Sequence, residues 1–334
     1  MDKDNATKRR LGRALSTKIW LMLAVLLILL HALPFVFPEF VHLFIITLLY
    51  ALMGQGWNIL GGYAGQFSFG HALFFGIGAY TSSLLFVKLG VSPWLGIVAG
   101  IGVAVAIGLF IGFLSFRYGL TGPFFALIML AFAEIFHMVS KSWDQVGAAL
   151  GILIPLKGNS PSLMQFTEKE PFYFMLLWIV ALVTYFTWRF EGTRTGLYWQ
   201  AIRENQDAAS ALGVSPMRFK LVAMTFSAGL TAMGGTIYAQ YLLYIDPDST
   251  FGVINSVEIM LRPIIGGPGT ALGPLLGSMV LTPLSEVTRI ALRAYSGAYL
   301  MLYGAILVIV VIFLPDGLMG MVKNWVRRFS KRTE

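Results

Sequence analysis

The stretch of sequence that decides the fold runs from Phe40 to Val87 and reads FVHLFIITLLYALMGQGWNILGGYAGQFSFGHALFFGIGAYTSSLLFV. Its 48 residues include no Asp, Glu, Lys or Arg, and the nearest charges are Glu39 and Lys88. It nevertheless contains eight glycines and several uncharged polar side chains, among them Gln55, Asn58, Gln66, Ser68 and His71. A segment this apolar, with polar groups and flexible backbone, predicts membrane-embedded helices that face a pathway or other helices.

The composition of the whole chain agrees with a membrane location. Of the 334 residues, 57% are hydrophobic and 12% are charged, which leaves too little polar surface for a soluble globule of this size. The absence of cysteine excludes a disulfide scaffold, a thiolate metal site and a cysteine nucleophile. The net charge of +8 is concentrated in the two tails and one loop, so it indicates membrane topology and not nucleic-acid binding.

Several windows are long enough to cross a hydrocarbon core, which takes roughly 20 helical residues. They are Ile19 to Phe37, Phe40 to Leu60, Gln66 to Val87, Trp94 to Phe116, Pro123 to Ser140, Phe172 to Trp188, Leu221 to Tyr244 and Tyr299 to Leu314. A further apolar region, 251–294, is longer than one span and is broken by Gly266-Gly-Pro-Gly269. We therefore predict an all-α polytopic membrane protein of about 8–10 transmembrane crossings, with glycine-broken segments and a possible internal repeat.

Basic residues predict the orientation. Residues 1–18 and 321–334 form basic tails that precede and follow a transmembrane permease domain at 19–320. Both tails are expected to stay in the cytoplasm. An apolar run after a basic tail also resembles a secretory signal, but no small-x-small cleavage site follows Leu30, so we expect no cleavage. The same count places 141–171 outside the membrane and the basic segment 189–220 inside.

The region 251–294 must then cross the membrane twice in short pieces or dip in and return. Helix ends at membrane depth are tolerated only against protein or a water-filled cavity, so we expect this region to be internal. Gly61-Gly62 followed by Gly70 and Gly76 is echoed by Gly266-Gly267 followed by Gly273 and Gly277. The echo fits related halves of a transporter, and it equally fits ordinary helix packing through small residues.

The cytoplasmic loop at 191–217 has a distinct pattern. Good helix formers with apolar residues at Trp199, Ile202, Ala209 and Leu212 predict one amphipathic helix from Trp199 to Leu212, ended by Gly213. Such a helix could act as a lever that another protein pushes, or it could simply anchor the loop in lipid headgroups.

A family resemblance supports the lever. The run Asp207-Ala208-Ala209-xxx-Gly213 resembles the Glu-Ala-Ala-xxx-Gly signature of ABC importer permeases, with Asp in place of Glu. The wider match covers nearly everything from about Trp57 to Gly320. It includes Gly65-Gln-Phe-Ser-Phe-Gly-His71, Gly122-Pro-Phe-Phe-Ala-Leu, Asp246-Pro-Asp-Ser249, Gly266-Gly-Pro-Gly269 and Pro315-Asp-Gly-Leu318. Together these segments resemble the M-type (LivM-like) permeases of branched-chain amino acid ABC transporters.

The resemblance implies half of a translocation pathway in the bacterial inner membrane. The implied partners are a second permease of related type, two ABC ATPase subunits and a periplasmic amino-acid-binding protein. The residues expected to couple to an ATPase are Arg203, Glu204, Asn205, Asp207, Ala208, Ala209 and Gly213. The chain has no phosphate loop, so no cofactor is expected on it, and ATP and Mg²⁺ would bind the ATPase subunits. The nearest alternative to an amino-acid importer is an ABC permease for urea or short amides. A secondary transporter or channel is a further alternative, and it would need ion-coupling carboxylates in the membrane beyond Glu134.

Candidates for the pathway are uncharged polar groups, one buried acid and the glycine break, namely Asn58, Gln66, Ser68, His71, Glu134, Gly266 and Gly267. Glu134 has His137 one turn away, which allows either a structural pair or a role in the pathway. Ser68 and His71 have the spacing of a serine–histidine pair, but the sequence has no nearby acid to orient the histidine and no Gly-x-Ser-x-Gly elbow, so we do not expect a hydrolase. The four histidines are scattered without ligand spacing, so no metal site is expected. Glu258 and Arg262, four apart, suggest a pair. Arg289 and Arg293, also four apart, suggest outer-surface anchors or contacts for the binding protein.

Overall fold

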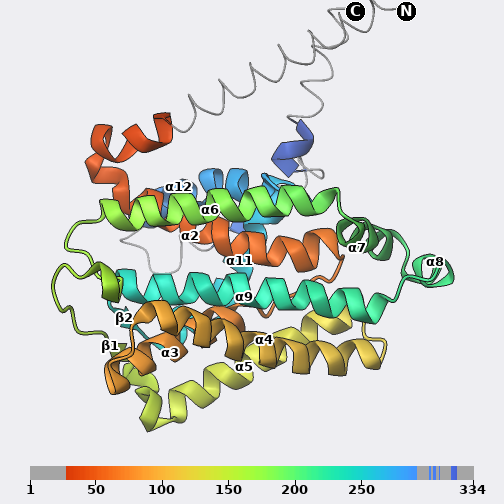
Figure 1. Ribbon diagram of the computed structural model, residues 1–334, viewed down its shortest axis with the longest axis horizontal. Coiled ribbons are helices and arrows are strands. Elements are labelled where there is room, and N and C mark those ends of the chain that lie inside the picture. The colour runs from red at the N-terminus through yellow and green to blue at the C-terminus, as the bar shows by residue number, and fades with distance from the viewer. Residues whose placement is uncertain (1–27, 292–300, 302–303, 306–307, 309–316, 322–334) are drawn as a thin grey trace, which may run out of the picture.

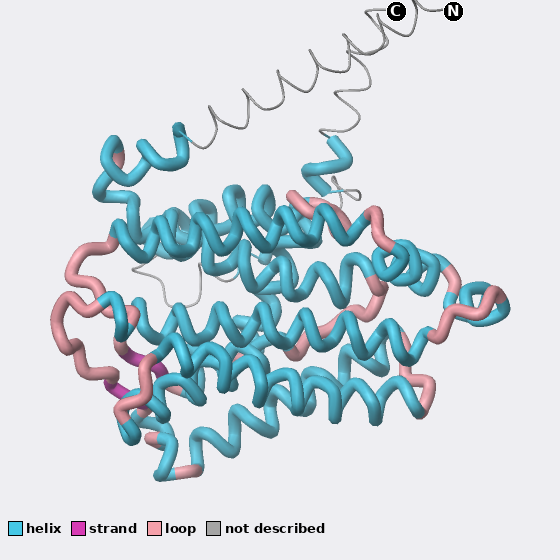
Figure 2. Tube along the Cα trace, in the orientation of Figure 1, coloured by secondary structure: helices cyan, strands magenta, loops and turns pink. Residues whose placement is uncertain are grey.

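The computed structural model describes residues 28–291, 301, 304–305, 308 and 317–321. This part of the chain is almost entirely helical, as Figure 2 shows. Six of its helices are long and apolar enough to cross a membrane. They are Pro38–Tyr63, which comprises η1 (Pro38–Phe40), α2 (Val41–Trp57) and the π-helical η2 (Asn58–Tyr63), then α3 (His71–Leu89), α4 (Pro93–Arg117), α5 (Gly122–Ser142), α6 (Glu170–Glu191) and α9 (Pro216–Leu242).

The protein is therefore an all-α multi-pass membrane protein, as the sequence predicts. Of the expected span 19–37, residues 28–36 are helical and 19–27 lie outside the described residues, and the expected span 299–314 lies largely outside them. One expected span begins later than predicted: residues 66–70 are not helical, and α3 starts only at His71. The turn at Gly65, with φ of +69°, ends the preceding helix, and a non-helical segment at this depth is tolerated because it is buried in protein.

The core of the bundle is built around α9, which packs against α3, α4 and α2. Its contact with α3 is backbone to backbone. A Cβ atom on Gly78 would lie 2.0 Å from the carbonyl oxygen of Ala232, and one on Gly235 would lie 2.0 Å from that of Phe75. Helices in lipid lack a hydrophobic driving force toward one another, so this close approach between small residues supplies the packing energy.

The two ends of the bundle differ (Figure 1). At one end, called here the strand end, β1 (Ile152–Leu153) pairs antiparallel with β2 (Tyr244–Ile245), beside η3 (Asp144–Val146), η4 (Ala148–Leu150), η5 (Pro161–Leu163) and α10 (Pro247–Phe251). At the other, called the loop end, α7 (Arg194–Glu204) and α8 (Gln206–Ala211) connect α6 to α9. The segments that the sequence assigns to opposite sides of the membrane thus lie at opposite ends.

The broken region forms two helices, α11 (Val253–Gly266) and α12 (Gly273–Ala291), which pack against each other. α11 starts near the strand end, and the connection at 267–272, called here the tip, reaches the loop end, where it contacts Glu191 and Gly62. At 1.5 Å per residue, the 14 residues of α11 extend about 21 Å, less than a full hydrocarbon core. Both helices lie against α2. α11 is mostly buried, as expected, whereas α12 has an exposed face that includes Met279, Val280, Val287 and Ile290.

Candidate functional site

The connection between α6 and α9 is held in place by caps and by two buried apolar residues. Thr193 caps α7 by accepting a hydrogen bond from the backbone N–H of Gly196 at 3.3 Å. Trp199 and Ile202 are buried, and the Trp199 indole donates to the Phe219 carbonyl at 2.8 Å, which ties α7 to the start of α9. α7 is therefore anchored to the start of α9.

The predicted single helix from Trp199 to Leu212 is wrong at Asn205. Asn205 is extended, and its side chain caps a second helix by accepting from the N–H groups of Asp207 and Ala208 at 3.0 and 2.9 Å. An asparagine oxygen that competes for backbone donors favours a helix start over a helix interior. The expected end is confirmed in position, because Gly213 follows α8 with φ of +87°.

α8 projects from the loop end as a short knob (Figure 1). Ala209 is its buried residue, while Glu204, Asp207 and Ala208 are exposed. Leu212, expected on the buried face with Ala209, lies just beyond the end of α8 and is 86% exposed. The knob therefore presents a leucine and two carboxylates away from the bundle.

Behind the knob, α7 contacts both glycine breaks. The Arg203 guanidinium donates through Nη1 to the carbonyl oxygen of Gly62 at 2.7 Å. It also lies against the tip, because a Cβ atom on Gly269 would stand 2.5 Å from the same Nη1. Gly269 has a left-handed backbone with φ of +71°, which a larger residue would strain. Arg203 thus connects the loop to η2 and to the tip.

The tip is also held by amide and carboxylate side chains. Asn58 accepts from the Gly269 N–H at 2.8 Å and donates to the Thr270 carbonyl at 2.9 Å, and Gln55 donates to the Ala271 carbonyl at 2.6 Å. Glu191, the last residue of α6, accepts from the Ala271 N–H at 3.1 Å. These bonds satisfy backbone groups that a broken helix leaves unpaired inside the bundle.

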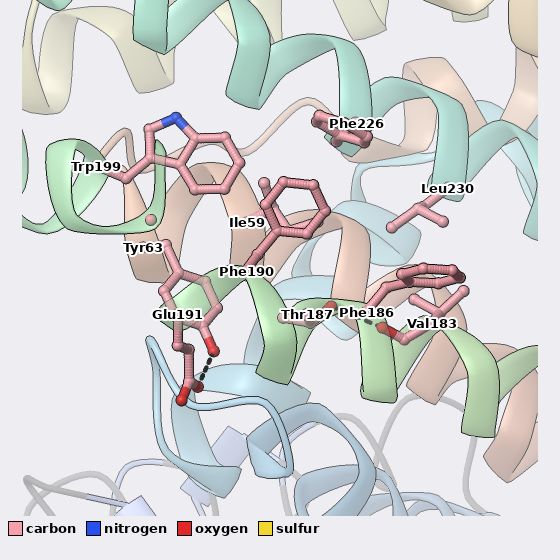
Figure 3. A pocket seen from close by; sticks show the side chains of 11 residues that line it. Ile59, Tyr63, Val183, Phe186, Thr187, Phe190, Glu191, Trp199, Phe226 and Leu230 are labelled. Carbon is pink, nitrogen blue, oxygen red and sulfur yellow. Dashed lines mark hydrogen bonds between the residues drawn. The ribbon is translucent and has the colours of Figure 1, made fainter. Parts of the chain in front are cut away.

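Glu191 also accepts a hydrogen bond from the Tyr63 hydroxyl at 2.5 Å, drawn in Figure 3. The same figure shows the apolar cavity of about 340 Å³ that lies between α6, α7 and α9, walled by Phe186, Phe190, Trp199 and Phe226. The cavity lies beside the Tyr63–Glu191 contact, because both residues also line it.

The predicted pathway residues separate into four groups. Asn58 bonds the tip at Gly269 and Thr270, and Gly266-Gly267 form the junction between α11 and the tip. Gln66 is 5% exposed and donates to the Ala64 carbonyl at 3.0 Å, which stabilises the buried non-helical segment. The structure therefore places Gln66 near η2 as a structural element of the break.

Ser68 and His71 lie in the buried interior. The Ser68 carbonyl accepts from the Trp57 indole at 2.8 Å, and its hydroxyl accepts from the Gly70 N–H at 3.2 Å. His71 Nε2 lies 2.7 Å from the Ser227 hydroxyl on α9. Both side chains are fully buried and bind neighbouring elements, which fits helix packing better than contact with a solute.

Glu134 lies apart from the other candidates. Its Oε2 is 3.4 Å from His137 Nδ1, and His137 Nε2 is 2.9 Å from Asp248 Oδ1, which Lys141 Nζ approaches to 2.6 Å. The hydrogen bond from Lys141 holds the pKa of Asp248 below its usual value. This chain of contacts ties α5 to α10 at the strand end, so of the two readings for Glu134 the structure favours pairing.

A second site at the strand end was not predicted as a site. A cavity of about 320 Å³ lies between α2, α9, α11 and α12 and is lined by two acid–base pairs. Arg262 Nη2 lies 3.3 Å from Glu258 Oε2, and Arg289 Nη2 lies 2.7 Å from Glu286 Oε1. The Glu258/Arg262 pair was expected from its spacing. Arg289, expected as an outer-surface anchor or a contact for the binding protein, is 61% exposed and also lines this cavity. No periodicity indicates that the two pairs share one space.

The comparisons with known proteins agree with these features. The family model described as branched-chain amino acid transport system / permease component matches residues 40–311. The high-affinity branched-chain amino acid transport system permease protein LivM of Escherichia coli K12 is 29% identical over 328 residues, which cover 91% of this chain and 75% of that protein.

More distant relatives match as well. The probable LivM permease protein of Methanocaldococcus jannaschii is 22% identical, with 81% of this chain and 90% of that protein covered. The LivH permease protein of Escherichia coli K12 is 26% identical, with 81% and 91% covered. No solved structure matches the chain significantly. The described part of the chain has six helices long and apolar enough to cross a membrane, and the family model matches residues 40–311, so this chain belongs to the permease components of branched-chain amino acid transport systems.

Proposed function

We propose that this chain is one of two permease subunits of an ATP-driven importer for branched-chain or other neutral amino acids. The names of the relatives support this, because both LivM and LivH proteins are permeases of a branched-chain amino acid transport system and both resemble this chain. In this proposal a LivH-like permease is the second half of the pathway.

The observation that carries the proposal is the continuous contact from the knob to the tip. α8 is exposed at the loop end, and Arg203 in the adjoining α7 contacts Gly62 and Gly269. An ATPase subunit docked on α8 would push α7, and the tip would move with it. Since α8 carries the Asp207-Ala208-Ala209-xxx-Gly213 signature, we assign 191–217 as the coupling loop.

The sequence has no phosphate loop, so in this proposal other subunits bind the nucleotide. ATP and Mg²⁺ bind two ATPase subunits on the cytoplasmic side, and a periplasmic binding protein delivers the amino acid to the strand end. Both basic tails lie in the cytoplasm of a bacterial cell, which places the strand end in the periplasm. The protein then contributes geometry, and nucleotide hydrolysis supplies the free energy.

The test is uptake of radiolabelled leucine by the complex of two permeases and two ATPase subunits in proteoliposomes. The binding protein is added outside and ATP is enclosed inside. Gly213→Pro cannot adopt a φ of +87°, so it should displace α8 and abolish both uptake and the stimulation of ATP hydrolysis by binding protein. Asp144→Asn, in η3 at the far end, is the control and should retain both. Uptake and stimulation that survive Gly213→Pro would show that α8 is not the coupling element. Uptake of urea and not of leucine would overturn the proposed substrate class.

A further inference from the structure

The strand-end cavity combines charges of both signs with an apolar wall. Its charged lining consists of Glu258, Arg262, Glu286 and Arg289, which sum to zero formal charge. The apolar part is formed by aliphatic and aromatic side chains, among them Ile46, Leu49, Met53 and Phe75. At about 320 Å³ it falls at the small end of ligand sites, which span about 300–1,000 Å³.

Arg262 is the least ordinary group in this lining. Its side chain is 1% exposed, yet it lies in an apolar helix where a buried cation is costly. Its guanidinium carbon lies 3.4 Å from the centre of the Tyr50 ring, and its two terminal nitrogens bind the backbone carbonyl and the carboxylate of Glu258. Stacking and two hydrogen bonds fix the plane of the guanidinium and leave other donors available.

Two buried polar atoms of the lining have no hydrogen-bond partner among the residues that the structure describes. They are Nε of Arg262 and Oγ1 of Thr282, whose residue is 4% exposed. An unpaired buried donor costs about 1–3 kcal/mol, so a partner from outside the described residues, such as a water or a ligand, would stabilise these groups. Here the two atoms belong to facing helices, α11 and α12, that line the same cavity.

We propose that this cavity binds the zwitterionic amino acid in transit. Arg262 and Thr282 supply donors for its carboxylate, Glu258 and Glu286 accept from its ammonium, and the apolar wall takes an aliphatic side chain. This inference rests on the proposed function and specifies the substrate class. Because the charges are already paired with each other, a zwitterion exchanges one set of ion pairs for another and binds weakly, as a transit site requires.

The absence of cysteine from the sequence gives a direct test. Ser285→Cys places a unique thiol in the cavity lining, and Ser162→Cys places one in the exposed η5 turn as a control. A charged methanethiosulfonate reagent is applied to the assembled complex in membranes without ATP, and labelling is read on this chain by mass. At a Kd of about 1 mM, leucine at about 10 mM should slow labelling at position 285 about tenfold and leave position 162 unchanged.

Leucine analogues identify the chemistry that is recognised. Leucinamide lacks the carboxylate and 4-methylpentanoate lacks the ammonium, so neither should protect position 285 at the same concentration. Urea should not protect it either. If Ser285→Cys fails to assemble, Asn255→Cys in α11 serves as a second lining position.

Equal labelling with and without leucine at both lining positions would overturn the site. So would protection by 4-methylpentanoate equal to that by leucine, or protection only by a short-chain phosphatidylethanolamine, which would indicate a lipid headgroup site. Leucine uptake by the unmodified complex is measured in parallel. If uptake depends on ATP but leucine does not protect the cavity thiol from labelling, the cavity is not the amino-acid site and the proposed function stands. If the unmodified complex does not take up leucine at all, the proposed function is refuted.

Discussion

The contact between Arg203 and the two glycine breaks can be tested by Arg203→Ala. A hydrogen bond from a charged donor contributes about 1.5–3 kcal/mol when buried. The Arg203 side chain is 41% exposed, so we take the low end, about 1.5 kcal/mol. If this energy links movement of α7 to movement of the tip, its loss should lower the coupling about tenfold.

The assay compares leucine uptake with ATP hydrolysis in proteoliposomes that contain the complete importer. Arg203→Ala should hydrolyse ATP at close to the normal basal rate while transporting about tenfold less leucine per ATP. The matched control is Arg117→Ala, an exposed arginine at the end of α4 whose nearest ring contact is Phe113, and its transport ratio should not change. An unaltered ratio in Arg203→Ala, with the protein correctly assembled, would refute the role of this contact.

Three further substitutions test other parts of the structure. Gly78→Leu should prevent the close approach of α3 to α9 and cost more than about 3 kcal/mol, seen as loss of folded protein in detergent by size-exclusion chromatography, whereas Gly102→Leu, with open space around it, should be tolerated. Asn205→Ala removes the cap of α8 and should cost about 0.5–2 kcal/mol locally, measured as faster hydrogen exchange in α8. The pKa of Asp248 is lowered in the folded protein, so its stabilising contribution is present above the ordinary carboxyl pKa and is lost as the pH falls through the folded value. The Asp248→Asn variant lacks this carboxylate. Between pH 7 and pH 3 its thermal stability should therefore fall less than that of the unmodified protein.

The fold class could be predicted because each of its causes is local in the sequence. The charge-free run from Phe40 to Val87 determines that two helices lie in the membrane, and the glycine run at 266–269 indicates where the inner pair breaks. The helix break at Asn205 could not be predicted with the same rules. Helix formers on both sides favour continuation, and only the cap geometry shows that the Asn205 oxygen competes successfully for the backbone donors.

The sites were predictable only in part, because their residues come together from distant elements. Glu191 is the first residue of the loop segment 191–217, yet nothing in the neighbouring sequence indicates that it accepts hydrogen bonds from both Tyr63 and Ala271. In the same way, Glu258 and Arg262 suggest a pair by spacing, but their proximity to Thr282 depends on how α12 folds back on α11. Long-range contacts of this kind leave no periodicity in a single sequence.

α11 joins the two sites, and its sequence indicates how movement at one could reach the other. Arg262 lines the strand-end cavity, and Gly267 at the tip is five residues further along, about 7.5 Å in helix rise. Pro263 stands between them, where it removes a backbone hydrogen bond and allows the helix to bend. Gly277 of α12 packs so closely that an added Cβ would lie 1.8 Å from the Arg262 carbonyl oxygen and 3.0 Å from the Gly266 backbone nitrogen, so α12 contacts α11 on both sides of Pro263. A push on the tip, which connects the two helices, would therefore shift the end of α11 and the start of α12 together. The contact between Gly277 and Arg262 would pass this shift to the strand-end cavity, so that movement of α7 would alter the cavity that holds the amino acid.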